Sequence, residues 1–510
     1  MNPPRELIYS LRFSAAILPV LLSCPTWAAE WKIVPSLGVE ARYSDNVSLT
    51  SDAAKQDDLI TLVTPGISIA ATGARLRFNA NYNPEVAYYA RGQQDTEVYQ
   101  QFDATGNAEL LERLLFFDAG ANVSQQNVSL LGPLTTSNVN TTGNRATVGT
   151  LYASPYLRRE VGSGVQAEAR YAYSVVKSDD PSDLSNSVGD LINLRLESGP
   201  AYKLLAWNLD YFRGNVDYEV ESDTSAEVIL ANARRLITPI VGLLAQVGHE
   251  NHETGVVGPK LEGRRWSAGF DWEPSPRTRL AATAGERFFG DAYFLDLRYR
   301  TRLTTWCAGF IQKVSSTRAE FFVPTTSSVI GDGNPLSSSR FSDTEPCEYA
   351  VESVIAQTGL PSLVAPVNFF SSQLFLVKRF QASAAIQGVR NVLIVNVFDE
   401  SREASAGSAA LPNTGDFAVS QTIMQTGTSL LWSWRMTAQT AWSLGGAYSR
   451  YEYPDVNRVD NFTYAGMGLT RQIEPRLSGS LSYRWQQNKS NESNSSYTEN
   501  AVFATFEQKF

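Results

Sequence analysis

The only histidines in the 510 residues, His249 and His252, lie three positions apart with Glu250 and Asn251 between them. Imidazole and carboxylate groups are ligand types that hold Zn²⁺ in proteins. A complete site needs further ligands at matching spacing, and neither a cysteine nor a third acidic ligand stands at such spacing nearby. Chance histidines at the outer end of a strand are the better explanation, and we expect neither a metal site nor a cofactor.

Nucleophilic hydrolysis is the other chemistry to consider, because a membrane-embedded hydrolase needs a serine beside a histidine. Histidine occurs only in the segment 249–252, so a Ser–His pair could form only there. The sequence therefore predicts that the chain is not an enzyme.

Apolar and polar residues alternate with a period of two along most of the chain, which indicates β-strands rather than helices. One face near the N-terminus carries Trp31, Ile33, Leu37, Val39, Ala41 and Tyr43. At the C-terminus Val502, Ala504, Phe506 and Phe510 share a face, and Phe503 is the one large apolar residue on the other. In a closed barrel within lipid, such strands are paired on both sides and their apolar face contacts acyl chains. A soluble β-sandwich that ends in a strand is the alternative.

Short and long connections take turns along the chain. The short ones include 72–74, 111–113, 274–277 and 471–475, and the long ones include 44–57, 127–145, 178–187, 400–417 and 486–495. Outer-membrane barrels have short periplasmic turns and long outside loops. We therefore predict an all-β, antiparallel, up-and-down transmembrane barrel of about 22 strands, within roughly 20 to 24, in the outer membrane of a Gram-negative cell. Whether Lys378 and Arg379 form a turn or lie within a strand is open.

The ends of the chain carry sorting features. Residues 1–28 combine Arg5 and Arg12, an apolar run at 13–22 and small residues before the end, which is typical of a cleaved export signal. The segment 21–24 also resembles a lipoprotein cleavage box that would leave Cys24 acylated; we favour plain cleavage near Ala28. Phe506 and Phe510 resemble the C-terminal signal that the barrel-assembly machinery recognises. One barrel domain is expected to fill residues 29–510.

The composition limits the partners. A mean hydropathy of −0.20 is compatible with a barrel, whose strands turn every second residue to water. The net charge of −9 and a pI near 5.1 argue against nucleic acid. The charged residues expected to line the lumen have both signs: Arg75, Arg77, Glu85, Asp103, Arg170, Arg265, Asp271, Asp296, Arg298, Arg300, Arg476 and Arg484. A lining of one sign would indicate an ion-selective pore. A mixed lining suits an uncharged or weakly charged hydrated passenger such as a carbohydrate, or merely satisfies a water-filled interior.

The longest connection, residues 315–369, is expected outside, with a short helix at 348–357. Connections of this length are usually functional or disordered. Cys307 and Cys347 form an even pair in an exported chain, which predicts a disulfide that ties the loop to the barrel wall. Two buried unpaired thiols are the alternative. We predict that the loop folds over or into the lumen as a gate; a stapled surface loop is the alternative.

A barrel of this width is usually plugged, as in energy-coupled transporters with an N-terminal plug domain. The first expected strand begins at Trp31, directly after the export signal. No room for a plug remains before it, which argues against an energy-coupled importer.

Several segments resemble the outer-membrane family associated with the PEP-CTERM protein-sorting system of exopolysaccharide-producing bacteria. They are residues 31–47, 58–61, 64–67, 298–302 and 388–391. The resemblance extends over essentially the whole mature chain and implies an outer-membrane barrel in a setting of exopolysaccharide export, without catalytic residues. We therefore expect a passive or gated conduit for exopolysaccharide, with lipid, polysaccharide and periplasmic export proteins as partners. A general diffusion porin and a non-conducting structural or polysaccharide-binding barrel are the alternatives.

Overall fold

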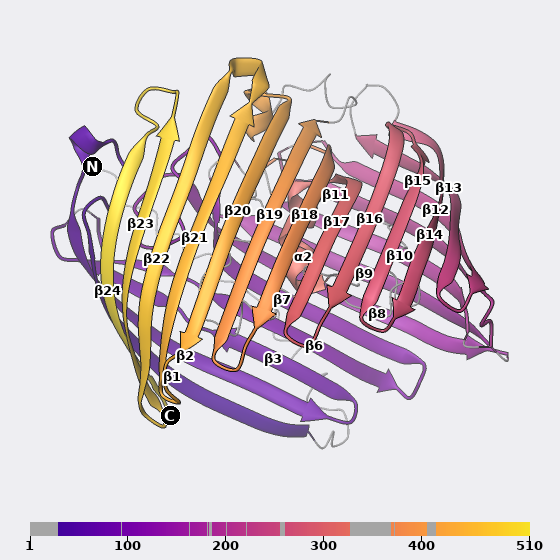
Figure 1. The fold of residues 1–510 in the computed structure, drawn as a ribbon, viewed down its shortest axis with the longest axis horizontal. Coiled ribbons are helices and arrows are strands. Elements are labelled where there is room, and N and C mark those ends of the chain that lie inside the picture. Colours follow the sequence, from indigo (N-terminus) through magenta and orange to yellow (C-terminus); the bar gives the residue numbers. More distant parts are fainter. Residues whose placement is uncertain are drawn as a thin grey trace.

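The strands of the protein form one closed antiparallel barrel (Figure 1). The computed structural model describes residues 29–92, 94–162, 164–180, 182, 186–199, 201–220, 222–254, 261–326, 369–371, 373–404 and 415–510. Closure comes from the first strand, β1 (Ala29–Ser44), which pairs with both β2 (Asp58–Gly73) and the last strand, β24 (Tyr497–Lys509). Val39 lies opposite Phe506 in that closing ladder, so the C-terminal strand has no free edge.

The remaining strands follow in chain order and pair with their neighbours around the wall. They are β3 (Leu76–Tyr82), β4 (Glu85–Tyr89), β5 (Glu97–Tyr99), β6 (Phe102–Leu111), β7 (Leu115–Asn127), β8 (Arg145–Val161), β9 (Val165–Ser178), β10 (Ser187–Ser198), β11 (Leu205–Tyr218), β12 (Thr224–Thr238), β13 (Val241–Thr254), β14 (Leu261–Ser275), β15 (Thr278–Arg287), β16 (Gly290–Arg300), β17 (Thr304–Ser315), β18 (Phe375–Gln387), β19 (Asn391–Ala404), β20 (Thr422–Arg435), β21 (Thr440–Tyr453), β22 (Arg458–Glu474) and β23 (Leu477–Ser490). The short helices are η1 (Asp52–Ala54), α2 (Thr317–Thr326), η4 (Gly415–Ala418) and η5 (Pro454–Val456).

Twenty-four hydrogen-bonded segments make a barrel of 22 strands, because two barrel strands are each interrupted once. β3 and β4 both pair with β2 and together form one barrel strand. β6 pairs with β3 and β5 pairs with β4, so β5 and β6 form the next one. Pro84 lies at the first interruption, where its missing N–H removes one bond from the ladder. The strand count predicted from the sequence is confirmed.

The outward face is apolar, as the alternation predicts. Trp31 and Phe506 are more than half exposed in the isolated chain, so these side chains meet lipid rather than a protein core. Phe503, the exception in the last strand, lies on the inward face beside Arg42, whose guanidinium carbon is 4.6 Å from the ring centroid. This cation–π contact explains an aromatic residue on the polar side.

The two ends of the barrel differ in the way the loop pattern predicts. The C-terminus lies at the end with the tight turns (Figure 1), which include 74–75, 276–277, 388–390 and 475–476. Longer connections such as 45–57 and 128–144 lie at the opposite, outer end. Lys378 and Arg379 lie within β18, which settles the question that the sequence left open.

The chain is an outer-membrane β-barrel, since a closed antiparallel wall with an apolar outer face satisfies every backbone group of the wall in hydrocarbon. Among the described helices, none has the length and apolar character needed to cross a membrane. Residues 1–28 lie outside the described part, so the export signal and the acylation of Cys24 stay predictions.

Two neighbouring positions on β2 test the assignment of the faces. Val63 faces outward between Val39 and Val86, whereas Thr64 faces inward and lines a lumen cavity. Val63→Arg is expected to lower the free energy of unfolding in lipid vesicles by about 2–4 kcal/mol, because the charge enters hydrocarbon. Thr64→Arg is the matched control and is expected to change it little. Urea titration of both refolded variants measures the difference, and equal losses would contradict the assignment.

Candidate functional site: loops folded into the lumen

Three outer connections fold inward and occupy part of the lumen. They are the β7–β8 connection (128–144), the described parts of the β17–β18 connection (α2 and 369–371) and the η4 segment of the β19–β20 connection. Figure 1 shows α2 inside the barrel, below the outer rim and between the walls. We call these three segments the inner loops.

The helix α2 begins at a capped position and is tied to the wall it comes from. Ser316 accepts a hydrogen bond from the N–H of Ala319, as an N-cap residue does. The buried carboxylate of Glu320 lies 3.3 Å from Lys313 on β17 and 3.7 Å from Arg379 on β18. Burial acts to raise the pKa of Glu320, but these two cations outweigh it and hold that pKa well below its usual range.

The opposite side of α2 contacts a distant part of the wall. Arg318 donates to Ser187 Oγ of β10 at 2.9 Å and to both oxygens of Ser174 on β9 at 2.9 and 3.0 Å. Phe322 packs into an apolar cluster with Val176 and residues of β8. The helix therefore joins the β17–β18 wall to the β8–β10 wall across the lumen.

Arg318 is buried without an acidic partner among the described residues. Its side-chain donors meet only hydroxyl and carbonyl oxygens, and Phe322 lies under the guanidinium at 5.2 Å. Burial lowers the pKa of Arg318. A charge held in this way is costly to bury, so this contact is weaker than one with a carboxylate.

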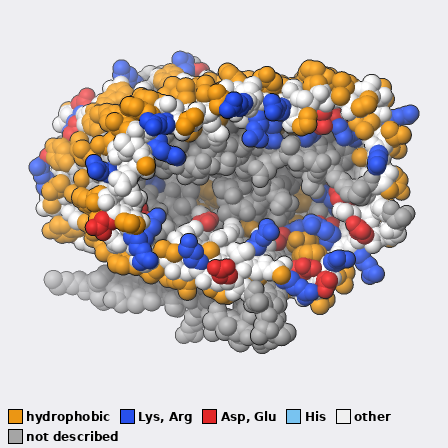
Figure 2. All heavy atoms as spheres, turned by 60° about the horizontal axis from the view of Figure 1, so that its bottom comes forward, with side chains coloured by type: hydrophobic (Ala, Val, Ile, Leu, Met, Phe, Trp, Pro, Cys, Tyr) orange, Lys and Arg blue, Asp and Glu red, His pale blue; other side chains and the backbone are white. Residues whose placement is uncertain are grey.

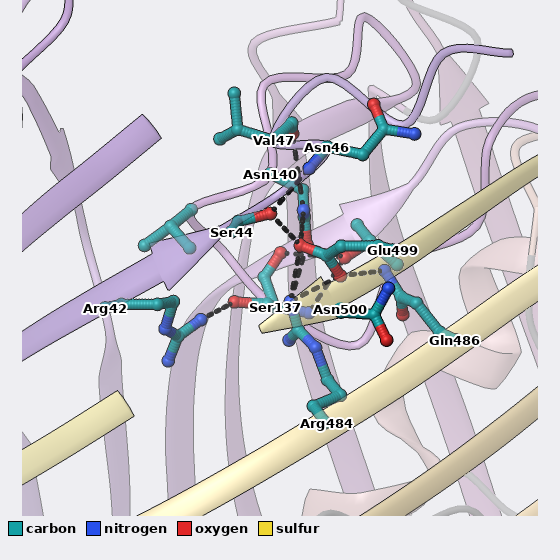
Figure 3. Close-up of polar contacts among 12 residues, drawn as sticks. Arg42, Ser44, Asn46, Val47, Ser137, Asn140, Arg484, Gln486, Glu499 and Asn500 are labelled. Atoms are coloured by element: carbon teal, nitrogen blue, oxygen red, sulfur yellow. Dashed lines mark hydrogen bonds and ion pairs between the residues drawn. The ribbon is translucent and has the colours of Figure 1, made fainter. Parts of the chain in front are cut away.

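The β7–β8 connection is held instead by an ion-pair hub around Glu499 of β24 (Figure 3). The fully buried Glu499 accepts hydrogen bonds from Arg484, Gln486, Ser44 and Asn140, at 2.7–2.8 Å for the shortest contact of each. Three of these partners belong to the wall, and Asn140 belongs to the inner loop. The hub therefore fixes the loop to the closing strands by charge-assisted bonds, which are stronger than neutral ones.

Two further contacts extend this attachment. Arg42 of β1 forms a 2.6 Å ion pair with Glu40 and also donates to Ser137 of the β7–β8 connection. Tyr497 of β24 donates from its hydroxyl to the carbonyl of Leu134. The β7–β8 connection thus crosses from its own strands to the seam where the barrel closes.

The inner loops share an apolar core with the wall. Leu130, Leu134, Phe369 and Phe417 come from the loops, and all four are at most 6% exposed. They pack on inward-facing residues of β18, β20, β21 and β22, namely Phe375, Val377, Ile423, Tyr451, Tyr453, Phe462 and Tyr464. An apolar cluster inside a lumen excludes water there, so the loops close this part of the channel.

A buried carboxylate connects two of the inner loops. Asp416 of η4 accepts hydrogen bonds from the hydroxyl of Ser129 and, at 2.7 Å, from the N–H of Leu130. Burial raises the pKa of Asp416 to about 6. Nearby, Arg458 of β22 donates to the carbonyl of Leu131 at 2.8 Å.

A polar cavity of about 370 Å³ remains beside the β7–β8 connection. Its lining combines Glu40, Arg42 and Glu85 with amide and hydroxyl side chains, which are those of Thr64, Gln101, Thr136, Ser137, Asn138 and Thr505. The groups suit a small hydrated solute, because they offer both donors and acceptors.

The predicted lumen residues fall into three groups. Arg170, Arg265, Asp271 and Arg484 lie buried on the inward face in ion pairs or hydrogen bonds. Arg77, Glu85, Asp103, Asp296, Arg298 and Arg300 also lie on the inward face by strand alternation. Arg75 and Arg476 lie in turns, at the periplasmic rim rather than in the wall. Ion pairs thus join some of the opposite charges in the wall, as between Arg170 and Asp118 and between Arg484 and Glu499.

The two histidines lie on opposite faces of β13. His252 faces inward, 3.8 Å from Glu250, and His249 faces outward, so they cannot share a metal ion. Within the described residues no group of three or more His, Cys, Asp or Glu side chains is placed to hold one. Cys307 is buried on β17, but Cys347 lies outside the described residues, so their pairing stays a prediction.

Sequence reasoning missed two of the inner loops. The connection at 127–145 was predicted only to be a long outer loop, although Leu130, Leu134 and Val139 are apolar residues without a strand to explain them. The helix expected at 348–357 lies outside the described residues, while the helix that is described, α2, begins at the Ser316 cap. Unexplained apolar residues and the serine cap were the available signals.

Comparisons with known proteins give fold likeness alone. No protein-family model matches the sequence, and no curated protein matches it. Among solved structures, two variants of the FrpB iron transporter from Neisseria meningitidis, F3-3 and F5-1, align with TM-scores of 0.51 at 10% and 9% identity. Each alignment covers 94% of this chain and 82% of the other. The ferric-catecholate import receptor Fiu from E. coli K12 aligns at 0.48, with 9% identity over 93% of this chain and 81% of that one. The likeness to the FrpB barrels therefore concerns the fold alone, and the resemblance to the PEP-CTERM-associated family stays a prediction.

The raised pKa of Asp416 predicts that stability depends on pH. Its pKa in the folded protein, about 6, exceeds the ordinary value of about 3.9, so the folded state holds the proton more tightly. Protonated Asp416 therefore adds at most about 3 kcal/mol to the free energy of unfolding. This stabilisation is fully present below about pH 4 and is lost as the pH rises through 6. The hydrogen-exchange protection factors of 128–131, corrected for the intrinsic pH dependence of amide exchange, should therefore be larger at pH 5 than at pH 7. Asp416→Asn, which imitates the protonated side chain, should remove the difference, and an unchanged pH profile would contradict the prediction.

Proposed function

We propose that the chain is a gated outer-membrane conduit that its own loops close at rest. The observation that carries the proposal is the position of α2, which spans from the β17–β18 wall to Ser174 and Ser187 on the opposite side. The first turn of the helix contacts both walls, and a segment placed between two walls in this way obstructs the lumen. An open diffusion porin has no need for such a contact.

The contacts indicate which inner loop moves. The β7–β8 connection is attached by the Glu499 hub and by apolar packing, so we assign it as fixed. The first turn of α2 is attached to β9 and β10 by Arg318 through neutral oxygens, and this contact costs less to break. Opening would therefore release α2 from β8–β10 while Glu320 keeps it tied to β17 and β18.

The passenger we propose is an exopolysaccharide that leaves the periplasm through the conduit. The support is the resemblance to the PEP-CTERM-associated family together with a lumen lined by amides, hydroxyls and paired charges. Such a lining exchanges hydrogen bonds with sugar hydroxyls at little cost. Periplasmic export proteins would deliver the chain, and the barrel needs no energy source of its own.

Planar-bilayer conductance tests the gate. The intact refolded protein is expected to be nearly silent, and a variant with 317–370 replaced by a short Gly-Ser linker is expected to open a large, weakly selective pore. Arg318→Ala combined with Phe322→Ala should open it intermittently, since both contacts with β8–β10 are lost. The control variant replaces the exposed Glu492 and Asn494 of the β23–β24 loop by glycine, which should leave the protein silent.

Either of two results would overturn the proposal. Large steady current in the intact protein would indicate a diffusion porin. Silence after loop replacement, in a variant that still shows the heat-modifiable migration of a folded barrel on gels, would indicate a structural barrel.

A further inference from the structure

Basic side chains collect at the periplasmic end of a chain whose net charge is −9. Figure 2 views this end and shows Lys and Arg around the mouth. Eight of these arginines are exposed and have no side-chain partner in the described part of the chain: Arg235, Arg277, Arg300, Arg302, Arg390, Arg435, Arg471 and Arg476. We call them the arginine rim.

Backbone hydrogen bonds place rim cations side by side. The N–H of Arg300 donates to the carbonyl of Arg277 at 2.8 Å, and that of Arg435 donates to the carbonyl of Arg390 at 2.7 Å. Like charges at adjacent strand positions destabilise a sheet. The fold therefore bears a local electrostatic cost here, which an anionic ligand would relieve.

The rim continues into the lumen along β15 and β16. Arg279 lies directly opposite Arg298, one pair further in than Arg277 and Arg300, and Arg302 occupies the turn below. Glu273 lies 3.6 Å from Arg279, and Asp296 interacts with Arg279 and Arg298. We call the five residues Arg277, Arg279, Arg298, Arg300 and Arg302 the arginine track.

We propose that the arginine track binds an acidic polysaccharide as it enters the barrel from the periplasm. This inference rests on the proposed conduit function and narrows its passenger to a chain that bears carboxylate groups. Guanidinium groups bind carboxylates through paired hydrogen bonds. The basic mouth also raises the local concentration of a polyanion and orients its approach.

The direction of the track favours a flexible chain over the other anionic partners. Arg298 and Arg300 face the lumen by strand alternation, away from phospholipid headgroups. A folded acidic protein would meet the rim but would not follow the arginines inward. The charged passenger also differs from the weakly charged one that the mixed lining suggests, because Arg277, Arg300 and Arg302 are exposed and have no side-chain partner in the described part of the chain.

The experiment measures binding of a fluorescent polygalacturonate oligomer to the full-length protein in phosphatidylcholine nanodiscs. A dextran oligomer of equal length serves as the neutral probe. Arg300→Gln combined with Arg302→Gln removes two positive charges from the track. The matched control, Arg264→Gln with Lys489→Gln, removes two exposed, unpaired positive charges from the outer half of the barrel.

Polygalacturonate is expected to bind the wild type and the control equally, and the track variant about tenfold more weakly, with dextran unbound throughout. Affinity should fall steeply with salt, as electrostatic binding does. Equal binding by the track and control variants would overturn the inference. So would loss of binding when phosphatidylglycerol is added to the nanodiscs, which would assign the arginines to lipid. Polygalacturonate can reach the arginine track while the gate is closed. A failed conductance test would therefore contradict the gated conduit without changing what the binding experiment shows about the track.

Discussion

The hydrogen-bond demand of the backbone in hydrocarbon is the constraint on which this structure depends. Lipid offers no partner for an unpaired N–H or C=O, so every strand edge has to be closed. The ladder between β1 and β24 meets that demand, and the pairing of Val39 with Phe506 places its apolar groups outside. Closure also fixes the alternation, because each residue in the wall faces either lipid or lumen.

A barrel of 22 strands leaves an interior too wide for wall side chains to fill. The chain fills part of it with its own outer connections, which bring Leu130, Phe369 and Phe417 to aromatic residues of the wall. Charged groups of the wall also bind these connections. Glu499 forms an ion pair with Arg484 and accepts a hydrogen bond from Asn140 of the β7–β8 connection. The inner loops and the inward face of the wall therefore form a small hydrophobic core inside the barrel.

The attachment of the inner loops is uneven, and in the gate proposed above this difference would decide which loop moves. One loop is fixed by ion pairs and apolar burial, whereas the contact of α2 with β9 and β10 depends on Arg318 and neutral oxygens. At the periplasmic end, Arg300 lies beside Arg277 and Arg435 beside Arg390, and none of the four has a side-chain partner among the described residues. The buried Arg318 and the neighbouring rim arginines both lower the stability of the protein. Both lie on the route that a passenger would take through the proposed conduit.

The sequence by itself determined the wall: the alternation from Trp31 to Phe510 and the parity of the connections predict the strand count, the facing of residues and the two ends. These signals are local, because a residue two positions away always returns to the same face. Only the tertiary structure decided what fills the lumen, since Asn140 meets Glu499 and Arg318 meets Ser187 across long separations that no periodicity encodes. The same holds for the charges. The sequence counts them, but only the register shows that Arg170 is paired with Asp118 while Arg300 stands next to Arg277 without a partner.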